Sequence, residues 1–141
     1  MKRLAASKPL FALLLVLLSV LACKLGSSSP TSTFKAFYEA QKKKDAAGIK
    51  KTLSKGSLAM LEKAAKEQNK TLDESLKEGF DEPAFKAPNT PETRNEKIDG
   101  DTATLEVQDE QTKKWDKLYF VKEDGDWKVA LDKMLEELFK D

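Results

Sequence analysis

The sequence predicts an α+β protein with helices in its first half, an antiparallel sheet of about four strands in its second half, and a short C-terminal helix. Three observations support this prediction. Apolar residues recur at helical spacing from residue 30 to residue 80. Pro83, Pro88 and Pro91 then end the helical half, because proline interrupts a helix. After Pro91 apolar and polar residues alternate, which is the period of a half-buried strand.

Four helices are predicted before the prolines, each from an N-terminal polar residue and an apolar stripe. The predicted starts are Ser29 followed by Pro30, Asp45, Ser57, and Thr71 with Glu74 as its capping-box partner. The corresponding stripes are Phe34, Phe37 and Tyr38; Ile49 and Leu53; Leu58, Leu61 and Ala65; and Leu72, Leu76 and Phe80. Each stripe is expected to face a shared core.

The sequence between Pro91 and Val121 predicts three strands. A weaker strand ends at Ile98, and Asp99-Gly100 is typical of a hairpin turn. Residues 103–107 alternate apolar and polar, so we expect one face of this strand to be buried. Residues 118–121 are apolar on both faces, which predicts a central strand.

A last strand and a helix complete the predicted fold. Asp124-Gly125 is typical of a turn, after which Trp127, Val129 and Leu131 follow at strand spacing. Helical spacing then recurs at Leu131, Met134, Leu135, Leu138 and Phe139. The apolar face of this helix must be buried, either against its own domain, which we favour, or in the groove of a partner.

Composition excludes several classes of function. The 141 residues include 25 Lys and Arg, 24 Asp and Glu, and no histidine. Without histidine there is no histidine-based triad, histidine metal site or imidazole base. The six glycines form no phosphate-cradling loop, and the balanced charge gives no reason to expect a nucleic-acid partner. We therefore expect no catalysis, no cofactor and no metal site.

Residues 1–22 have the three parts of an export signal. A basic start containing Lys2 and Arg3 precedes an apolar run, and Ala22 provides a small residue before Cys23. The apolar run from Leu10 to Ala22 has 13 residues, whereas a membrane-spanning helix needs about 20. Cleavage before Cys23 is therefore a better interpretation than a transmembrane helix.

A cysteine directly after the cleavage site resembles the signal of bacterial lipoproteins. The resemblance implies that Cys23 carries a diacylglycerol and an acyl group, so that the lipid bilayer is a partner through acylated Cys23. It places the protein in the bacterial cell envelope, and Lys24 favours the outer membrane if the cell is Gram-negative. Residues 23–29 then form the lipidated cysteine and a flexible Gly- and Ser-rich tether.

Two further segments resemble the nuclear transport factor 2-like superfamily, especially its small bacterial lipoproteins of unknown function. The first is residues 32–45 followed by Ile49 and Leu53, and the second is Asp124-Gly125-Asp126-Trp127-Lys128-Val129. This resemblance implies that residues 30–141 form one domain. In that domain a curved sheet wraps around a long first helix and forms a cone with an apolar interior.

The resemblance also suggests what the interior of the cone does. The residues expected to line a pocket are Phe34, Phe37, Tyr38, Trp115, Phe120 and Trp127. We expect a membrane-anchored, non-catalytic binding or scaffolding module whose partner is a small apolar ligand or an envelope protein. The alternative is a small-molecule isomerase or hydrolase that uses the cone pocket. Relatives of the ketosteroid isomerase type use a first-helix tyrosine, but Phe37 occupies that position here and Tyr38 follows it, which counts against the alternative.

Overall fold

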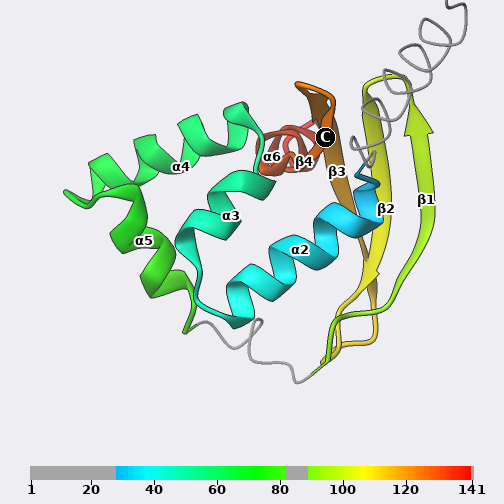
Figure 1. The fold of residues 1–141 in the computed structure, drawn as a ribbon, viewed down its shortest axis with the longest axis horizontal. Coiled ribbons are helices and arrows are strands. Elements are labelled where there is room, and N and C mark those ends of the chain that lie inside the picture. The colour runs from blue at the N-terminus through cyan, green and yellow to red at the C-terminus, as the bar shows by residue number, and fades with distance from the viewer. Residues whose placement is uncertain (1–27, 82–88, 141) are drawn as a thin grey trace, which may run out of the picture.

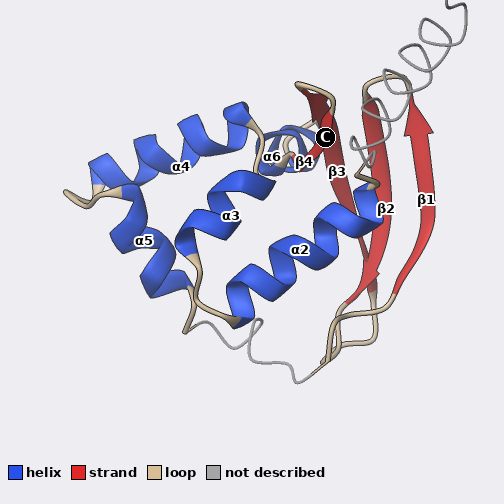
Figure 2. Cartoon of the chain, in the orientation of Figure 1, coloured by secondary structure: helices blue, strands red, loops and turns tan. Residues whose placement is uncertain are grey.

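The computed structural model describes residues 28–81 and 89–140 of the chain. These residues form helices α2 (Pro30–Lys42), α3 (Ala46–Thr52), α4 (Lys55–Glu67) and α5 (Leu72–Gly79), then strands β1 (Thr93–Asp99), β2 (Thr102–Gln108), β3 (Trp115–Glu123) and β4 (Asp126–Val129), and finally helix α6 (Leu131–Leu138) (Figure 1). Helices come first, an antiparallel sheet follows and a short helix ends the chain (Figure 2). The predicted α+β fold is therefore confirmed.

The sheet is a simple meander in the order β1-β2-β3-β4. Strands β2 and β3 pair without interruption from Thr102 opposite Val121 to Gln108 opposite Trp115. The pairing of β1 with β2 is irregular between Arg94 and Lys97. Strand β3 is therefore paired on both sides, as its apolar composition predicts.

The β3–β4 turn has the backbone conformation that its sequence predicts. Glu123 pairs with Asp126, which leaves Asp124 and Gly125 as a two-residue loop. Both have positive φ, 52° at Asp124 and 87° at Gly125, as a type I′ turn requires. Glycine adopts this conformation without a steric penalty, and aspartate is one of the few other residues that tolerate it.

Three of the four predicted helix starts are confirmed and one is wrong. Ser29, Asp45 and Thr71 each accept a hydrogen bond from a backbone N–H in the first turn of their helix. The third helix begins three residues earlier than predicted, because Ser54 is its N-cap and accepts a hydrogen bond from the N–H of Ser57 at 3.0 Å. Ser57 itself is fully buried inside the helix.

The core lies between the sheet and the first helices. Helix α2 packs across the sheet, and α3 packs against α2 and β4, whereas α4 and α5 lie on the side away from the strands (Figure 1). The core contains apolar side chains from all of these layers: Phe34, Tyr38, Ala40, Ile49, Leu53, Phe80, Ala103, Leu105, Phe120, Trp127 and Val129. The predicted stripe of α2 is thus its buried face.

The last strand ends earlier than the alternation of apolar residues predicts. Strand β4 ends at Val129, and Leu131 begins α6 instead of continuing the strand. The backbone N–H of Leu131 donates to the Ser57 hydroxyl at 2.8 Å, and Met134 N–H donates to the carbonyl of Ala130. The chain leaves the sheet at this point because Ser57 of α4, and not a neighbouring strand, accepts the hydrogen bond from the N–H of Leu131.

Helix α6 is divided between a packed face and an exposed end. Leu131 and Met134 are half-buried and lie against the domain. Leu138 and Phe139 are 66% and 82% exposed. Packing on its own domain, the expectation we favoured, therefore describes the beginning of this helix and not its end.

The predicted signal peptide, Cys23 and most of the tether lie outside the described residues. Ser28 and Ser29, at the end of the predicted tether, contact the domain. The Ser28 hydroxyl accepts a hydrogen bond from the N–H of Trp127 at 2.9 Å, and Ser29 caps α2. Within the described residues, no helix has both the length and the hydropathy needed to cross a bilayer.

Candidate binding cavity

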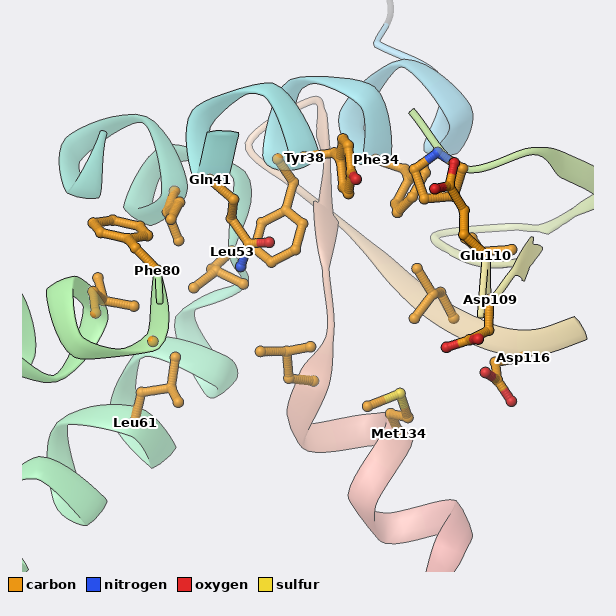
Figure 3. Close-up of a pocket in the computed structure, with 18 of the residues that line it drawn as sticks. Phe34, Tyr38, Gln41, Leu53, Leu61, Phe80, Asp109, Glu110, Asp116 and Met134 are labelled. Carbon is orange, nitrogen blue, oxygen red and sulfur yellow. The ribbon is translucent and has the colours of Figure 1, made fainter. Parts of the chain in front are cut away.

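A cavity of about 790 Å³ lies between the helices and one end of the sheet (Figure 3). Its volume is within the range of roughly 300–1,000 Å³ that is usual for small-molecule sites. The described lining residues come from α2 to α6 and the residues that follow α3 and α5, from the segment before β1, and from β2, β3 and their connection: Phe34, Phe37, Tyr38, Gln41, Ile49, Leu53, Leu61, Ser75, Leu76, Gly79, Phe80, Pro91, Val107, Gln108, Asp109, Glu110, Gln111, Asp116, Leu118, Leu131 and Met134. Most of the wall is apolar.

Aromatic side chains of α2 form one wall. Phe34 and Tyr38 are one helical turn apart, so both rings lie on the same face, with their centroids 6.1 Å apart. Both are 5% exposed or less. Phe37 lines the same cavity and is half-buried. Phe80, which follows α5, is also buried and contributes a ring near Gln41, at the end of the cavity away from the acidic residues (Figure 3).

Three acidic residues lie at the other end of the cavity, beside the connection between β2 and β3 (Figure 3). Asp109 and Glu110 follow the last residue of β2. Asp116 is in β3 opposite Val107, and directly paired residues project from the same face of a sheet. The register of β2 and β3 therefore places the Asp116 side chain on the face that carries the cavity.

Asp109 shapes this connection as well as lining the cavity. Its Oδ1 accepts hydrogen bonds from the backbone N–H groups of Thr112 at 2.6 Å and Gln111 at 2.9 Å. These bonds stabilise the charged carboxylate, chiefly the one from Thr112, and hold the pKa of Asp109 below its usual value. Asp109 is therefore negatively charged at neutral pH.

Tyr38 has a hydroxyl group that stays protonated over a wider range than usual. Burial raises the pKa of Tyr38, and the negative charges of Glu110 and Glu39 raise it further. Glu110 and Tyr38 line the same cavity, so the negative charge at the β2–β3 connection opposes ionisation of the phenol. At neutral pH the cavity thus contains a neutral phenol and carboxylates.

Two buried oxygen atoms in the wall have no hydrogen-bond partner among the described residues. They are Oε1 of Gln41, from α2, and Oγ of Ser75, from α5. A buried polar group without a partner costs about 1–3 kcal/mol. Both atoms line the cavity, so a donor group on a bound molecule can supply the missing hydrogen bonds.

The structure brings three of the six predicted pocket residues to the cavity. Phe34, Phe37 and Tyr38 line it, whereas Trp115, Phe120 and Trp127 are not among its lining residues. Adjacent residues of a strand point to opposite faces, so Trp115 lies on the face opposite to Asp116 and Leu118. The guanidinium group of Arg94 covers the Trp115 ring at 3.9 Å.

Phe120 and Trp127 are enclosed in the core instead of lining the cavity. Phe120 is 1% exposed and pairs with Val129 and Ala103 in the middle of the sheet. Trp127 is 5% exposed, and its carbonyl accepts a hydrogen bond from Thr33 near the start of α2. These two aromatic residues therefore stabilise the fold next to the cavity.

The acidic residues and the two unpartnered oxygen atoms were not predicted as site residues. Four other aspartates, Asp99, Asp101, Asp124 and Asp126, lie in or beside the hairpin turns. Asp116 has one sequence signal, since it lies two residues before Leu118 on the same face of a strand. Among the described residues, no group of three acidic or thiol side chains is placed to hold a metal ion.

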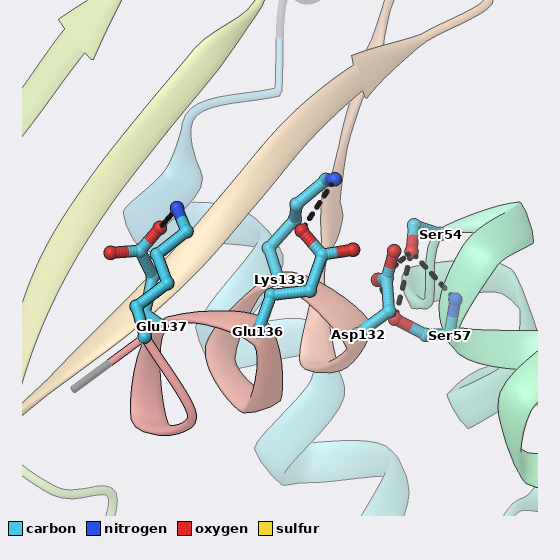
Figure 4. Close-up of polar contacts among 7 residues, drawn as sticks. Ser54, Ser57, Asp132, Lys133, Glu136 and Glu137 are labelled. Atoms are coloured by element: carbon cyan, nitrogen blue, oxygen red, sulfur yellow. Dashed lines mark hydrogen bonds and ion pairs between the residues drawn. The ribbon is translucent and has the colours of Figure 1, made fainter.

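A second polar cluster joins α4 to α6, outside the cavity (Figure 4). Oδ1 of Asp132 lies 2.9 Å from Oγ of Ser57 and 3.1 Å from Oγ of Ser54. The two serines are only 0% and 1% exposed, so a substrate cannot reach their hydroxyl groups. This cluster connects secondary structure elements and is not a candidate for nucleophilic catalysis.

Comparisons with protein-family models, with curated proteins and with solved structures found no match for this chain. The class that the structure defines is an α+β protein with a mainly apolar cavity. The resemblances to bacterial lipoproteins and to the nuclear transport factor 2-like superfamily remain predictions from the sequence.

Proposed function

We propose that this chain is a non-catalytic binding module, held at a bacterial envelope membrane by acylated Cys23, whose cavity takes a small apolar ligand. The observation that carries this proposal is the cavity of about 790 Å³ with its aromatic and aliphatic wall. A bound apolar molecule gains packing contacts with this wall and removes its own apolar surface, and that of the wall, from water.

The first described residues support a short distance between the domain and the membrane. Ser28 is hydrogen-bonded to Trp127, so four residues, 24–27, lie between the domain and Cys23. The five extended steps from Cys23 to Ser28 span no more than about 18 Å. The attachment point lies near the β3–β4 turn, whereas the acidic end of the cavity is at the opposite end of β3. The acidic end therefore faces away from the attachment point.

The binding function can be tested by recovering the ligand. The full chain is purified from bacterial membranes in polymer-bounded lipid discs and extracted with organic solvent, and the extract is examined by mass spectrometry. A Gly79→Trp variant blocks the cavity, because Gly79 lines it and a Cβ atom at this position meets nothing within 4 Å. Lys77→Trp, on the exposed face of the same helix, is the matched control.

We expect an apolar compound that is enriched with the wild-type chain and the Lys77→Trp variant and absent with Gly79→Trp. Lipids of the disc are common to all three samples and cancel in the comparison. Identical extracts from all three proteins would contradict the proposed function. The intact mass of the same samples shows whether residues 1–22 have been removed and whether Cys23 carries its lipid.

An isomerase or hydrolase is the second candidate, and one observation favours it. Tyr38 and Glu110 line the same cavity, so a hydrogen-bond donor and a carboxylate base are both present. Incubation of the recovered ligand with the protein in deuterated water distinguishes this candidate. An isomerase that abstracts a proton from carbon introduces deuterium into the ligand, and Glu110→Gln abolishes the exchange. A binding module leaves the ligand mass unchanged.

A further inference from the structure

The charge of the cavity indicates what kind of apolar ligand it takes. We infer, building on the proposed binding function, that the ligand is a cationic amphiphile: its apolar body packs against the aromatic wall and its amine lies beside Asp109, Glu110 and Asp116. This inference specifies the ligand by sign of charge and by hydrogen-bonding capacity.

The lining of the cavity carries an excess of negative charge. The whole chain is almost neutral, with 25 basic and 24 acidic residues. Among the described residues that line the cavity, three are acidic and none is lysine or arginine. All three acidic side chains lie at the end formed by the β2–β3 connection and the start of β3 (Figure 3). An ammonium group is attracted to this end, whereas a carboxylate is repelled from it.

Among the described residues, none of the three carboxylates takes part in an ion pair. Asp109 accepts hydrogen bonds from two backbone N–H groups, and the positive charge of Lys113 acts on it without forming an ion pair. The three carboxylates therefore present a net negative potential to a molecule in the cavity.

The interior of the cavity also favours a ligand with hydrogen-bond donors. Oε1 of Gln41 can only accept a hydrogen bond, whereas Oγ of Ser75 can accept or donate. A carboxylate has only acceptor oxygens, so it can pair with the Ser75 hydroxyl and leaves Oε1 of Gln41 unpaired. A ligand with N–H or O–H donors can satisfy both atoms, which favours an amine or an alcohol over a fatty acid.

Three probes with the same alkyl chain separate these contributions: dodecylammonium, dodecanol and dodecanoate. Their binding to the purified full chain is measured by calorimetry below the concentration at which each forms micelles, and the heat measured with Gly79→Trp is subtracted as background. We expect dodecylammonium to bind most tightly and dodecanoate most weakly, with Kd values at least about tenfold apart. The difference should shrink as salt is added, because salt screens partly exposed charges.

Paired variants assign the preference to the acidic end. We expect Glu110→Gln with Asp116→Asn to weaken dodecylammonium binding and so to reduce its advantage over dodecanol, with Asp109 maintaining the remainder, and to leave dodecanol binding unchanged. The matched control is Asp99→Asn with Asp101→Asn, which removes the same charge at the β1–β2 hairpin, at the other end of β2. This control should leave the order of the three probes intact. Circular dichroism and thermal melting confirm that all variants are folded.

The outcomes distinguish this inference from the proposed function. If none of the three probes binds above the Gly79→Trp background, the proposed function and the inference both fail. If dodecanol binds but dodecanoate binds as tightly as dodecylammonium, the cavity binds ligands and the inference about charge is wrong. If the double variant at Glu110 and Asp116 prefers dodecylammonium as strongly as the wild type does, the assignment to the acidic end is wrong.

Discussion

The hydroxyl of Ser57 donates a hydrogen bond to Oδ1 of Asp132 across 2.9 Å, although 75 residues separate the two in the chain. Ser57 is fully buried in α4, and Asp132 is the second residue of α6. The same hydroxyl oxygen accepts a hydrogen bond from the N–H of Leu131. The first turn of α6, which carries the cavity-lining Leu131 and Met134, is thereby fixed to α4.

Gly56→Ala is expected to weaken this connection. Replacement of a helical glycine by alanine normally stabilises a helix by about 1 kcal/mol. Here the new Cβ would lie 2.3 Å from Oδ2 and 2.9 Å from Cγ of Asp132, so the carboxylate must move away from Ser54 and Ser57. We expect a net loss of roughly 1–3 kcal/mol in the free energy of unfolding, measured by urea denaturation.

Gly79→Ala provides the matched control for this prediction. Gly79 is also in a helix, and a Cβ atom at this position meets nothing within 4 Å. We expect the stability to stay the same or to rise slightly, because alanine restricts the unfolded chain more than glycine does. If both variants are as stable as the wild type, Asp132 is not held in place as the hydrogen bonds indicate.

The two ends of α6 should respond differently to truncation of their side chains. Leu131→Ala removes a half-buried side chain that packs on the core and lines the cavity, so we expect a loss of about 1–3 kcal/mol in stability. Phe139→Ala removes a ring that is 82% exposed, so we expect a change within about 0.5 kcal/mol. Thermal unfolding of both variants checks this. A large loss with Phe139→Ala would mean that the exposed end is buried by a contact in solution.

The helix starts and turns that could be predicted depend on contacts within a few residues. Thr71 and Glu74 bond to each other's backbone N–H groups, and Asp124 and Gly125 form a turn by themselves. The third helix start was wrong because Ser54 and Ser57 satisfy the same local rule. What separates them are contacts with residues far away in sequence: the N–H of Ser54 donates to the carbonyl of Val129, whereas the Ser57 hydroxyl accepts from the N–H of Leu131. No local pattern contains that information.

The cavity also has one part that local sequence patterns predict and one part that depends on distant contacts. The aromatic wall of α2 follows from helical spacing, so Phe34, Phe37 and Tyr38 could be predicted from the sequence alone. The acidic end depends on the register of β2 and β3, which places Asp116 on the cavity face and Trp115 on the opposite face. A shift of one residue in this register would place Trp115 on the cavity face and Asp116 on the opposite face. The spacing of apolar residues predicts nothing about the connection between the strands.

Alkaline pH should destabilise the protein through Tyr38. Because its pKa in the folded state is raised above the ordinary value of 10.0, the folded state keeps a proton that the unfolded state loses. This contribution to stability is present in full below pH 10 and is lost as the pH rises through the folded-state pKa. We expect Tyr38→Phe to lose less stability than the wild type between about pH 9 and pH 11, measured by urea denaturation.

The carboxylate of Glu110 provides a second test of the ionisation of the Tyr38 hydroxyl. Glu110→Gln removes a negative charge that opposes ionisation of the phenol, so the pKa of Tyr38 should fall. The ultraviolet absorbance of tyrosinate during an alkaline titration reports this, and subtraction of the Tyr38→Phe titration identifies the signal. An unchanged titration in Glu110→Gln would mean that the Glu110 charge does not reach the aromatic wall.

Attachment to the membrane should depend on one sulfur atom. Cys23 is the single cysteine in the chain, and it lies outside the described residues. We expect bacteria grown with radiolabelled palmitate to label the wild-type protein and not Cys23→Ala. Two or more acyl chains anchor a protein stably, so the wild type should stay with membranes in high salt and dissolve only in detergent. A wild-type protein that retains residues 1–22, or that salt releases from membranes without detergent, would contradict lipid anchoring and the envelope location proposed with it.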